Sequence, residues 1–332
     1  MVAELSANHN GNLERALASV RAAADSGVDA VKLQTFRPDT ITIRSDRPEF
    51  IVPGQGPWAG RTLYDLYEEA HLPWEWHAPL FQEASRCGII AFSTPFDHSA
   101  VDLLESLDAP GYKIASLELI DDDLIRHVAS LKKPMIISTG MATLEEILHA
   151  LTIARAAGAQ DIVVLKCTSS YPAPDDSMHL VTLPALEAAT GCLVGLSDHS
   201  MGTVASVVAV TLGACVIEKH FTLSRAEGGV DSHFSLEPEE LVQLVDQVRR
   251  TRQMLGEVRF GPGAADGETV VFRRSLYAVA DIAPGEVLTR ENVRSIRPGH
   301  GLSPMYLELV LGRRATRTIA HGTPIDWVHI TT

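Results

Sequence analysis

The first 255 residues contain eight short apolar runs that alternate with segments of helical spacing, and this alternation limits the possible folds more than any other feature. The runs are typical of buried strands, whereas Leu144, Ile147, Leu148 and Leu151 form the apolar stripe expected on a helix. The expected strands cover residues 2–6, 30–35, 89–94, 111–116, 134–139, 161–168, 192–198 and 215–222. Eight strand–helix units in this length predict an α/β fold, the (β/α)₈ TIM barrel. A doubly wound open sheet is the alternative, but the GxGxxG turn that it often carries is not present.

The remaining segments predict how the chain is divided. Ser99 and Thr143 are expected to cap helices, and a last helix over residues 237–255 opens at Pro238. Residues 36–74 are rich in Pro, Gly and aromatic side chains, which predicts a functional loop over the barrel mouth. We expect a barrel domain over residues 1–256, a linker over 257–274 and a small β-rich domain over 275–332. The small domain is marginal alone and is expected to dock on its own barrel or a partner's.

The net charge of −14 argues against nucleic acid or an anionic membrane as a partner, because phosphate contacts need clustered basic residues. The four cysteines are scattered without paired spacing, as free thiols in a reducing compartment are. The start has no basic and apolar signal-peptide pattern, and the apolar run 204–217 is interrupted by polar residues and glycine. These observations predict a soluble, cytoplasmic protein.

Only six of the 28 basic residues are lysines, and four of those six fall inside expected strands. Lysine is rarely buried, although a lysine at a strand end can also extend to solvent. Lys32, Lys113 and Lys166 together predict a cage for a small polyanion such as a phosphorylated carboxylic acid. Lys219 cannot share a strand face with its neighbours Glu218 and His220, so we assign it to the outside of the barrel.

Two histidines follow at the ends of the last two expected strands, which are neighbours in a barrel. His199 and His220, with oxygen donors nearby, predict a divalent metal site rather than two structural imidazoles. Glu4 lies in the first expected strand and is either a general acid or base or a structural partner of a lysine. Asp231 is either a supporting residue of the site or a turn former.

A series of ordered motifs resembles the sialic acid synthase family. The matching motifs are Glu-Leu-Ser-Ala-Asn-His-Asn-Gly (4–11), Val-Lys-Leu-Gln-Thr (31–35), Tyr-Lys-Ile-Ala-Ser (112–116), Ile-Ser-Thr-Gly-Met (137–141), Lys-Cys-Thr-Ser-Ser-Tyr-Pro-Ala-Pro (166–174), Gly-Leu-Ser-Asp-His-Ser (195–200) and Glu-Lys-His-Phe-Thr-Leu (218–223). The tail 273–302 resembles the antifreeze-like (SAF, β-clip) domain of the same proteins. Residues 231–238 and Phe96-Asp97 are most similar to the pseudaminic acid synthase branch. Members of the family carry residues before the first strand, so the start of this chain is expected to be shortened.

The resemblance implies a condensation of phosphoenolpyruvate with an acetamido sugar and water, giving a nine-carbon 2-keto acid and phosphate. In the pseudaminic acid branch the sugar is 2,4-diacetamido-2,4,6-trideoxy-L-altrose. The same family includes N-acetylneuraminate and legionaminate synthases, which are the nearest alternatives. A metal-dependent aldolase or sugar-phosphate enzyme on the same barrel is a more distant alternative. A non-catalytic SAF-domain binding protein is the alternative outside enzymes.

The resemblance also implies roles for individual residues. His199 and His220 would bind Mn²⁺, and Glu4 would handle protons. Lys32 and Thr94 would hold the phosphoenolpyruvate carboxylate, and its phosphate would contact Lys113, Ser116, Ser138, Ser169 and Ser197. Ser169 stands where N-acetylneuraminate synthases can carry asparagine. The sugar would face Gln34, Tyr171 and Asp231, and Arg297 would reach its N-acetyl group from the other subunit of a domain-swapped homodimer.

Overall fold

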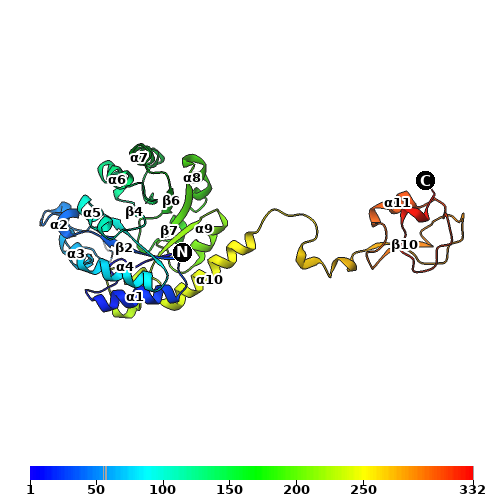
Figure 1. Ribbon diagram of the computed structural model, residues 1–332, viewed down its shortest axis with the longest axis horizontal. Helices are drawn as coiled ribbons and strands as arrows, with labels where there is room; N and C mark the ends of the chain where they lie inside the picture. Colours follow the sequence, from blue (N-terminus) through cyan, green and yellow to red (C-terminus); the bar gives the residue numbers. More distant parts are fainter. Residues whose placement is uncertain (55, 57, 332) are drawn as a thin grey trace. The chain divides into compact units, whose positions relative to one another are not determined.

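Eight parallel strands close into a barrel in the computed structural model, which describes residues 1–54, 56 and 58–331 (Figure 1). The strands are β1 (Val2–Glu4), β2 (Ala30–Thr35), β3 (Ile90–Pro95), β4 (Tyr112–Ile114), β5 (Met135–Ser138), β6 (Ile162–Cys167), β7 (Leu193–Asp198) and β8 (Val216–His220). They pair in chain order, and β8 returns to β1 with His220 opposite Glu4. Each predicted strand overlaps an observed one, so the TIM barrel is confirmed.

Helices surround the strands and make the outer layer of the barrel (Figure 1). They are α1 (Leu13–Asp25), α2 (Pro38–Ile41), α3 (Leu63–Ala70), α4 (His77–Arg86), α5 (His98–Ser106), α6 (Asp122–Ser130), α7 (Leu144–Ala157), α8 (Thr182–Thr190), α9 (Val204–Thr211) and α10 (Pro238–Leu255). Thr143 caps α7 as predicted, because its side chain accepts a bond from the Glu146 backbone N–H at 3.2 Å. The Ser99 prediction is wrong: the carboxylate of Asp97 accepts from the Ala100 N–H and caps α5. The segment 36–74 is not a plain loop, since it contains α2 and α3.

The barrel lumen changes character from one end to the other. Val2, Ala30 and Phe92 form an apolar layer near the strand starts. Since side chains alternate along a strand, the next inward positions on these strands are Glu4, Lys32 and Thr94. The apolar outward faces pack under the helices as the main core. Apolar side chains therefore fill the lumen near the starts of the strands, and charged side chains fill it toward their carboxyl ends.

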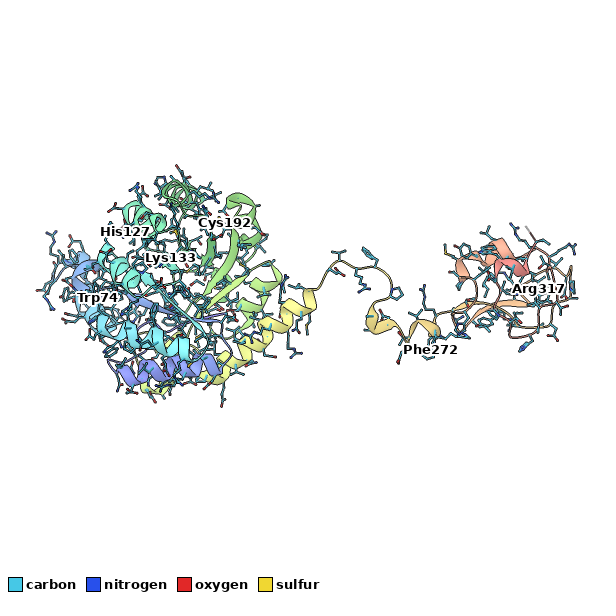
Figure 2. All side chains as sticks on the ribbon, viewed as in Figure 1. Trp74, His127, Lys133, Cys192, Phe272 and Arg317 are labelled. Atoms are coloured by element: carbon cyan, nitrogen blue, oxygen red, sulfur yellow. The ribbon has the colours of Figure 1, made fainter. Side chains whose placement is uncertain are left out.

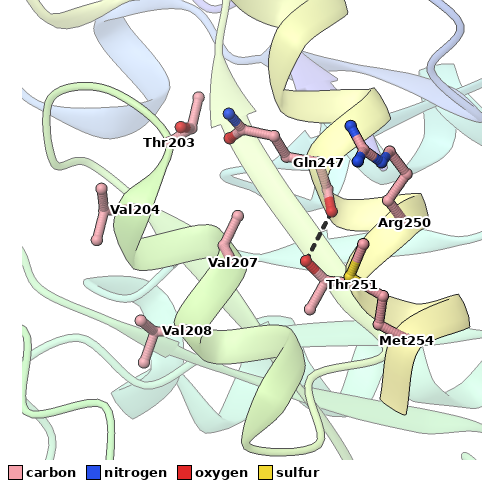
Figure 3. A pocket seen from close by; sticks show the side chains of 8 residues that line it. All are labelled: Thr203, Val204, Val207, Val208, Gln247, Arg250, Thr251 and Met254. Carbon is pink, nitrogen blue, oxygen red and sulfur yellow. Dashed lines mark hydrogen bonds between the residues drawn. The ribbon is translucent and has the colours of Figure 1, made fainter. Parts of the chain in front are cut away.

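Helices α9 and α10 pack beside each other on the outside of the barrel, and Figure 3 shows the groove between them. A cavity of about 400 Å³ lies there, with Val204, Val207 and Val208 on one side and Gln247, Thr251 and Met254 on the other. Among the described residues that line it, Arg250 is charged, and none is a lysine, a histidine or a carboxylate. The chemistry-bearing residues predicted from the sequence all lie elsewhere.

The chain divides into two compact units, Met1–Gly256 and Glu257–Thr332. The second unit contains an antiparallel pair of strands, β9 (Ser275–Ala278) and β10 (Val293–Ile296), and the short helix α11 (Leu307–Val310). Its own small core includes Leu276, Ile282, Val310, Ile319 and Ile325. Within the described residues, no helix combines the length and the apolar character needed to cross a membrane.

Candidate active site

Two lysines and two glutamates meet inside the barrel, all of them buried. Lys32 on β2 forms an ion pair with Glu4 on β1, and its Nζ also donates to Thr94 Oγ1 at 3.2 Å. Lys113 on β4 donates to Glu218 Oε1 on β8 at 3.2 Å, and Ser197 Oγ donates to the same oxygen at 3.0 Å. Lys32 Nζ lies 3.8 Å from Glu218 Oε1 and joins the two pairs. Four of the predicted anion-binding residues, Lys32, Thr94, Lys113 and Ser197, are therefore brought together in one charged layer.

Glu218 is a site residue to which the sequence reasoning gave no role. The signal was available, because strand alternation places position 218 on the same face as His220. The neighbouring Lys113 and Lys32 outweigh the cost of burial and hold the pKa of the Glu218 carboxyl well below its usual range. Burial and the nearby Glu218 charge raise the pKa of Glu4 despite its contact with Lys32. Of the two carboxyls, Glu4 is thus the one that accepts a proton more readily.

The third lysine of the predicted cage does not face the lumen. Lys166 Nζ donates to the Cys167 carbonyl at 3.0 Å and to Thr168 Oγ1 at 2.9 Å, outside the charged layer. The inward position on β6 belongs to Cys167, whose Sγ lies 3.8 Å from His199 Nδ1. The prediction for Lys166 is wrong because side chains alternate along β6, and Cys167, the register partner of the lumen-facing Ser197, takes the inward position. Lys133, labelled in Figure 2, is also elsewhere and donates to Glu105 at 2.7 Å.

Lys219 faces away from the lumen as predicted, yet it does not extend to solvent. Only 1% of the residue is exposed, and its Nζ lies 3.0 Å from Asp198 Oδ2 on the neighbouring strand. The side chain is covered because the helices pack over the outer face of the strands. The Lys219 side chain is therefore buried between the barrel strands and the helical layer and does not lie on the surface.

His199 and His220 lie together at the ends of β7 and β8, with ring centroids 5.3 Å apart. His199 Nδ1 is 2.8 Å from the Thr168 carbonyl, so in the neutral imidazole the proton lies on Nδ1 and the lone pair on Nε2. Burial lowers the pKa of His220 well below its usual value, so that ring is neutral, and its buried Nδ1 has no partner among the described residues. The described residues contain no group of three or more metal-binding side chains. The pair therefore fits a metal ion that completes its coordination with water or substrate.

Hydroxyl groups gather at the ends of β4, β5 and β6. Ser116 Oγ and Ser169 Oγ lie 3.2 Å apart, and Ser138 Oγ is buried without a partner among the described residues. A Cβ added to Gly140 would come within 2.5 Å of Ser116 Cβ and 2.8 Å of Ser169 Oγ, so only glycine permits this approach. Ser116 and Ser169 thus form a cradle of donors suited to a phosphate, and Ser138 adds a buried hydroxyl on the intervening strand β5.

A cavity of about 310 Å³ opens above the charged layer. The predicted sugar-facing residues Gln34, Tyr171 and Asp231 line it together with His220. Gln34 Nε2 donates to Glu4 Oε1 at 3.1 Å, and Asp231 accepts a bond from Ser6. The remaining lining includes apolar and aromatic side chains from the segment after β2: Phe36, Ile41, Val52, Trp58, Leu63, Leu66, Tyr67 and Ala70. The segment predicted to cover the mouth thus forms one wall of the cavity.

Glu118 and Trp58 also line this cavity and were not predicted. Burial raises the pKa of Glu118 to about 7. Trp58 Nε1 donates to the Val230 carbonyl at 2.9 Å, next to Asp231. Glu118 lies two residues after Ser116, so its position in the same βα loop was the only signal in the sequence.

Arg297 lies in the second unit, directly after β10, with an exposed side chain.

Comparison with known proteins identifies the family of this chain. The NeuB family model matches residues 19–260, and the SAF domain model matches residues 273–331. The chain belongs to the NeuB family and carries a C-terminal SAF domain.

Individual relatives match over nearly the whole chain. The chain is 45% identical to a protein named pseudaminic acid synthase of Campylobacter jejuni, over 97% of this chain and 94% of the relative. It is 40% identical to the protein of the same name from Helicobacter pylori, over 98% of this chain and 96% of the relative. A crystal structure of N-acetylneuraminic acid synthetase from Leptospira borgpetersenii superposes with a TM-score of 0.72 at 29% identity, covering 81% of this chain and 89% of that one.

Proposed function

We propose that the chain is a pseudaminic acid synthase, a transferase that condenses phosphoenolpyruvate with 2,4-diacetamido-2,4,6-trideoxy-L-altrose and water. The products are pseudaminic acid and phosphate. The observation that carries the proposal is the grouping of four features at the carboxyl ends of the strands. They are a layer with two lysines, a pair of serine hydroxyls, two adjacent imidazoles and a partly apolar cavity. The relatives named for this reaction, at 40% and 45% identity, support the choice of sugar.

The charged layer suits the phosphoenolpyruvate anion. Lys32 and Thr94, already 3.2 Å apart, would hold the carboxylate, and Lys113, Ser116, Ser138, Ser169 and Ser197 would hold the phosphate. In the described lumen two lysines face two glutamates, so the charges balance before substrate enters. Protonation of Glu4, whose pKa is raised, would leave a net positive charge for the incoming anion.

The residues also suit the chemistry. The enol carbon of phosphoenolpyruvate attacks the open-chain aldehyde, water adds to the resulting cation at C2, and the C–O bond to phosphate breaks. Lys113 and the serine hydroxyls stabilise the departing phosphate because they are fixed before the charge develops. Glu4, hydrogen-bonded to Gln34, would exchange a proton with the sugar or the attacking water.

His199 and His220 fit a divalent metal, which we propose to be Mn²⁺. In its neutral form His199 carries a lone pair on Nε2 because Nδ1 bonds to the Thr168 carbonyl. His220 is neutral, and its Nδ1 has no partner among the residues that the structure describes. A bound divalent ion would supply polarisation of the aldehyde oxygen. The chain's own part is to hold both imidazoles in the correct tautomer and spacing.

The sugar cavity joins polar groups to an apolar wall. Gln34, Tyr171 and Asp231 would contact hydroxyl and amide groups, while Phe36, Ile41 and Val52 offer surface for acetamido methyls and a 6-deoxy carbon. N-acetylneuraminate and legionaminate synthesis use the same chemistry on other acetamido sugars and are the alternatives. An apolar wall favours the 6-deoxy sugar over N-acetylmannosamine, which carries a hydroxyl there.

We further propose that the SAF domain of one subunit covers the barrel mouth of the other, with Arg297 reaching the N-acetyl group. The barrel unit has 34 acidic and 19 basic residues, whereas the second unit has nine arginines against eight acidic residues. The βα loops of the barrel also leave Leu117, Ile120, Met141 and Val181 exposed. Charge contrast and uncovered apolar side chains both favour a covering partner. The four free cysteines are consistent with a cytoplasmic location, which we also propose.

Phosphate release from phosphoenolpyruvate with a panel of acetamido sugars, with and without chelator, tests the proposal. We expect release that requires a divalent metal, is fastest with the altrose derivative and yields a nine-carbon keto acid by mass spectrometry. Preference for N-acetylmannosamine would contradict the choice of sugar alone. No release with any sugar would contradict the synthase function.

A further inference from the structure

An ion pair is buried on the outer face of the last two barrel strands, where it touches neither substrate cavity nor solvent. Asp198 on β7 and Lys219 on β8 are each 1% exposed, and Lys219 Nζ lies 3.0 Å from Asp198 Oδ2. The two residues are also register partners in the β7–β8 ladder. Burial of two charges is costly, and such a pair adds little net stability compared with apolar residues. Its position next to the site calls for another role.

The pair is connected to the backbone on both sides of His199. Asp198 Oδ1 accepts from the Ser200 backbone N–H at 2.9 Å and from Ser200 Oγ at 2.7 Å. Lys219 Nζ donates to the Ser200 carbonyl. Asp198 Oδ2 accepts from Ser206 Oγ at 2.6 Å, which ties the turn to helix α9. Asp198, Lys219 and Ser206 therefore hold residues 198 to 200 from outside the barrel, and we call these three side chains the clamp.

The clamp and the two imidazoles occupy alternate positions on the same strands. His199 directly follows Asp198, and His220 directly follows Lys219, so a bond between the outer residues sets the spacing of the inner ones. The His199 ring has its own anchor at the Thr168 carbonyl, whereas the buried Nδ1 of His220 has no partner among the described residues. The orientation of His220 relative to His199 thus depends on the backbone that the clamp holds.

We infer that Asp198, Lys219 and Ser206 are positioning residues that hold His199 and His220 at metal-binding distance from the outer face of the barrel. This inference rests on the proposed metal-dependent function. Residues behind metal ligands commonly affect affinity about 10- to 100-fold, although they do not touch the metal. A merely structural ion pair would change thermal stability and leave the metal affinity of the folded chain unaltered.

Two variants with matched controls test the inference on the full chain with Mn²⁺ as the probe. The double variant Asp198→Asn/Lys219→Met removes both charges and leaves no buried charge unpaired. Its control is Glu105→Gln/Lys133→Met, which removes a partly buried pair that lies outside the charged layer. Ser206→Ala removes one hydroxyl bond to the clamp, and Ser19→Ala removes a comparable bond between a buried helix serine and the Arg15 carbonyl.

Free Mn²⁺ is measured by its electron paramagnetic resonance signal, and folding by circular dichroism and thermal melting. We expect Mn²⁺ affinity to fall about 10- to 100-fold in Asp198→Asn/Lys219→Met and by a smaller factor in Ser206→Ala, with both controls like the wild type. If the double variant does not fold, the Ser206→Ala and Ser19→Ala pair decides alone. Wild-type affinity in the folded clamp variants would overturn the inference. Failure of the wild type itself to bind Mn²⁺ would instead contradict the proposed metal site.

Discussion

At the residue scale, Lys113 and Lys166 show what a strand position decides. Lys113 points into the lumen and contacts Glu218, whereas Lys166 bonds to Thr168 outside the charged layer. Residue type alone placed both in the predicted cage. The alternation of side chains along β6 distinguishes the two lysines, because Cys167 takes the inward position and its neighbour Lys166 must face outward. The kinds of side chain in the site were therefore predictable from the sequence. Whether a given residue belongs to the site depended on which face of its strand it occupies.

This difference predicts opposite results for two matched substitutions. Lys113→Met would remove the charged donor that we propose for the phosphate, so phosphoenolpyruvate binding should weaken by about 10- to 100-fold, as for a lost hydrogen bond to a charged group. Lys166→Met should leave binding close to wild type, because within the described part of the chain its ammonium bonds to Cys167 and Thr168, outside the charged layer. Isothermal titration with phosphoenolpyruvate measures both. Equal losses in the two variants would contradict the assignment.

Glu118 gives a prediction for the pH dependence of stability. Its pKa is raised from 4.5 to about 7 by burial, so the folded chain binds a proton that the unfolded chain releases between these values. The contribution of Glu118 to stability is thus fully present below pH 4.5 and is lost as the pH rises to 7. Glu118→Gln should melt at a temperature that falls less between pH 5 and pH 7 than that of the wild type. Parallel melting curves across that range would contradict this account.

At the element scale, the helix and strand order followed from the sequence because local patterns determine it. Eight apolar runs became β1 to β8, and the cap of α7 at Thr143 was visible as a side chain followed three residues later by Glu146. The cap of α5 was misplaced because Asp97 and Ser99 are both good capping residues, and only the backbone geometry selects Asp97. The meeting of Glu4 with Lys32, and of Lys113 with Glu218, depends on closure of the barrel and on the way side chains extend across the lumen. No local pattern contains that information.

The α7 cap provides a prediction on stability without loss of function. Thr143→Ala removes the bond to the Glu146 N–H and should lower the free energy of unfolding by about 1 kcal/mol. Thr152→Ala, in the middle of the same helix, removes only a bond to the Leu148 carbonyl and should be neutral or slightly stabilising. Urea unfolding of both variants measures the difference, and phosphate release should stay at the wild-type rate. A larger effect at Thr152 than at Thr143 would show that the cap does not stabilise α7.

At the scale of the whole molecule, the proposed exchange of SAF domains predicts complementation between two inactive chains. His199→Ala should lose metal binding and activity while the barrel stays folded, and Arg297→Ala should lose activity with metal binding intact. In a heterodimer of the two, the barrel of the Arg297→Ala chain would receive an intact Arg297 from its partner. Differently tagged chains, co-expressed and purified through both tags, should therefore regain phosphate release.

The complementation experiment distinguishes an Arg297 that acts on the partner's barrel from an Arg297 that acts on the barrel of its own chain. If Arg297 acts on the barrel of its own chain, each site in the heterodimer carries one defect, and no activity returns. Each variant purified through its own tag as a homodimer serves as the control and should be inactive. The sequence could suggest this arrangement only through family resemblance, because neither residue type nor spacing says which subunit a domain covers.

The central claim is that the charged layer carries a condensation in which phosphoenolpyruvate loses phosphate by C–O cleavage. Phosphoenolpyruvate labelled with ¹⁸O at the bridging oxygen, incubated with the altrose derivative and Mn²⁺, tests it most directly by mass spectrometry of both products. We predict that the label appears in the released phosphate and that the nine-carbon acid is unlabelled. Label retained in the keto acid, or release of labelled pyruvate without a nine-carbon product, would contradict the account.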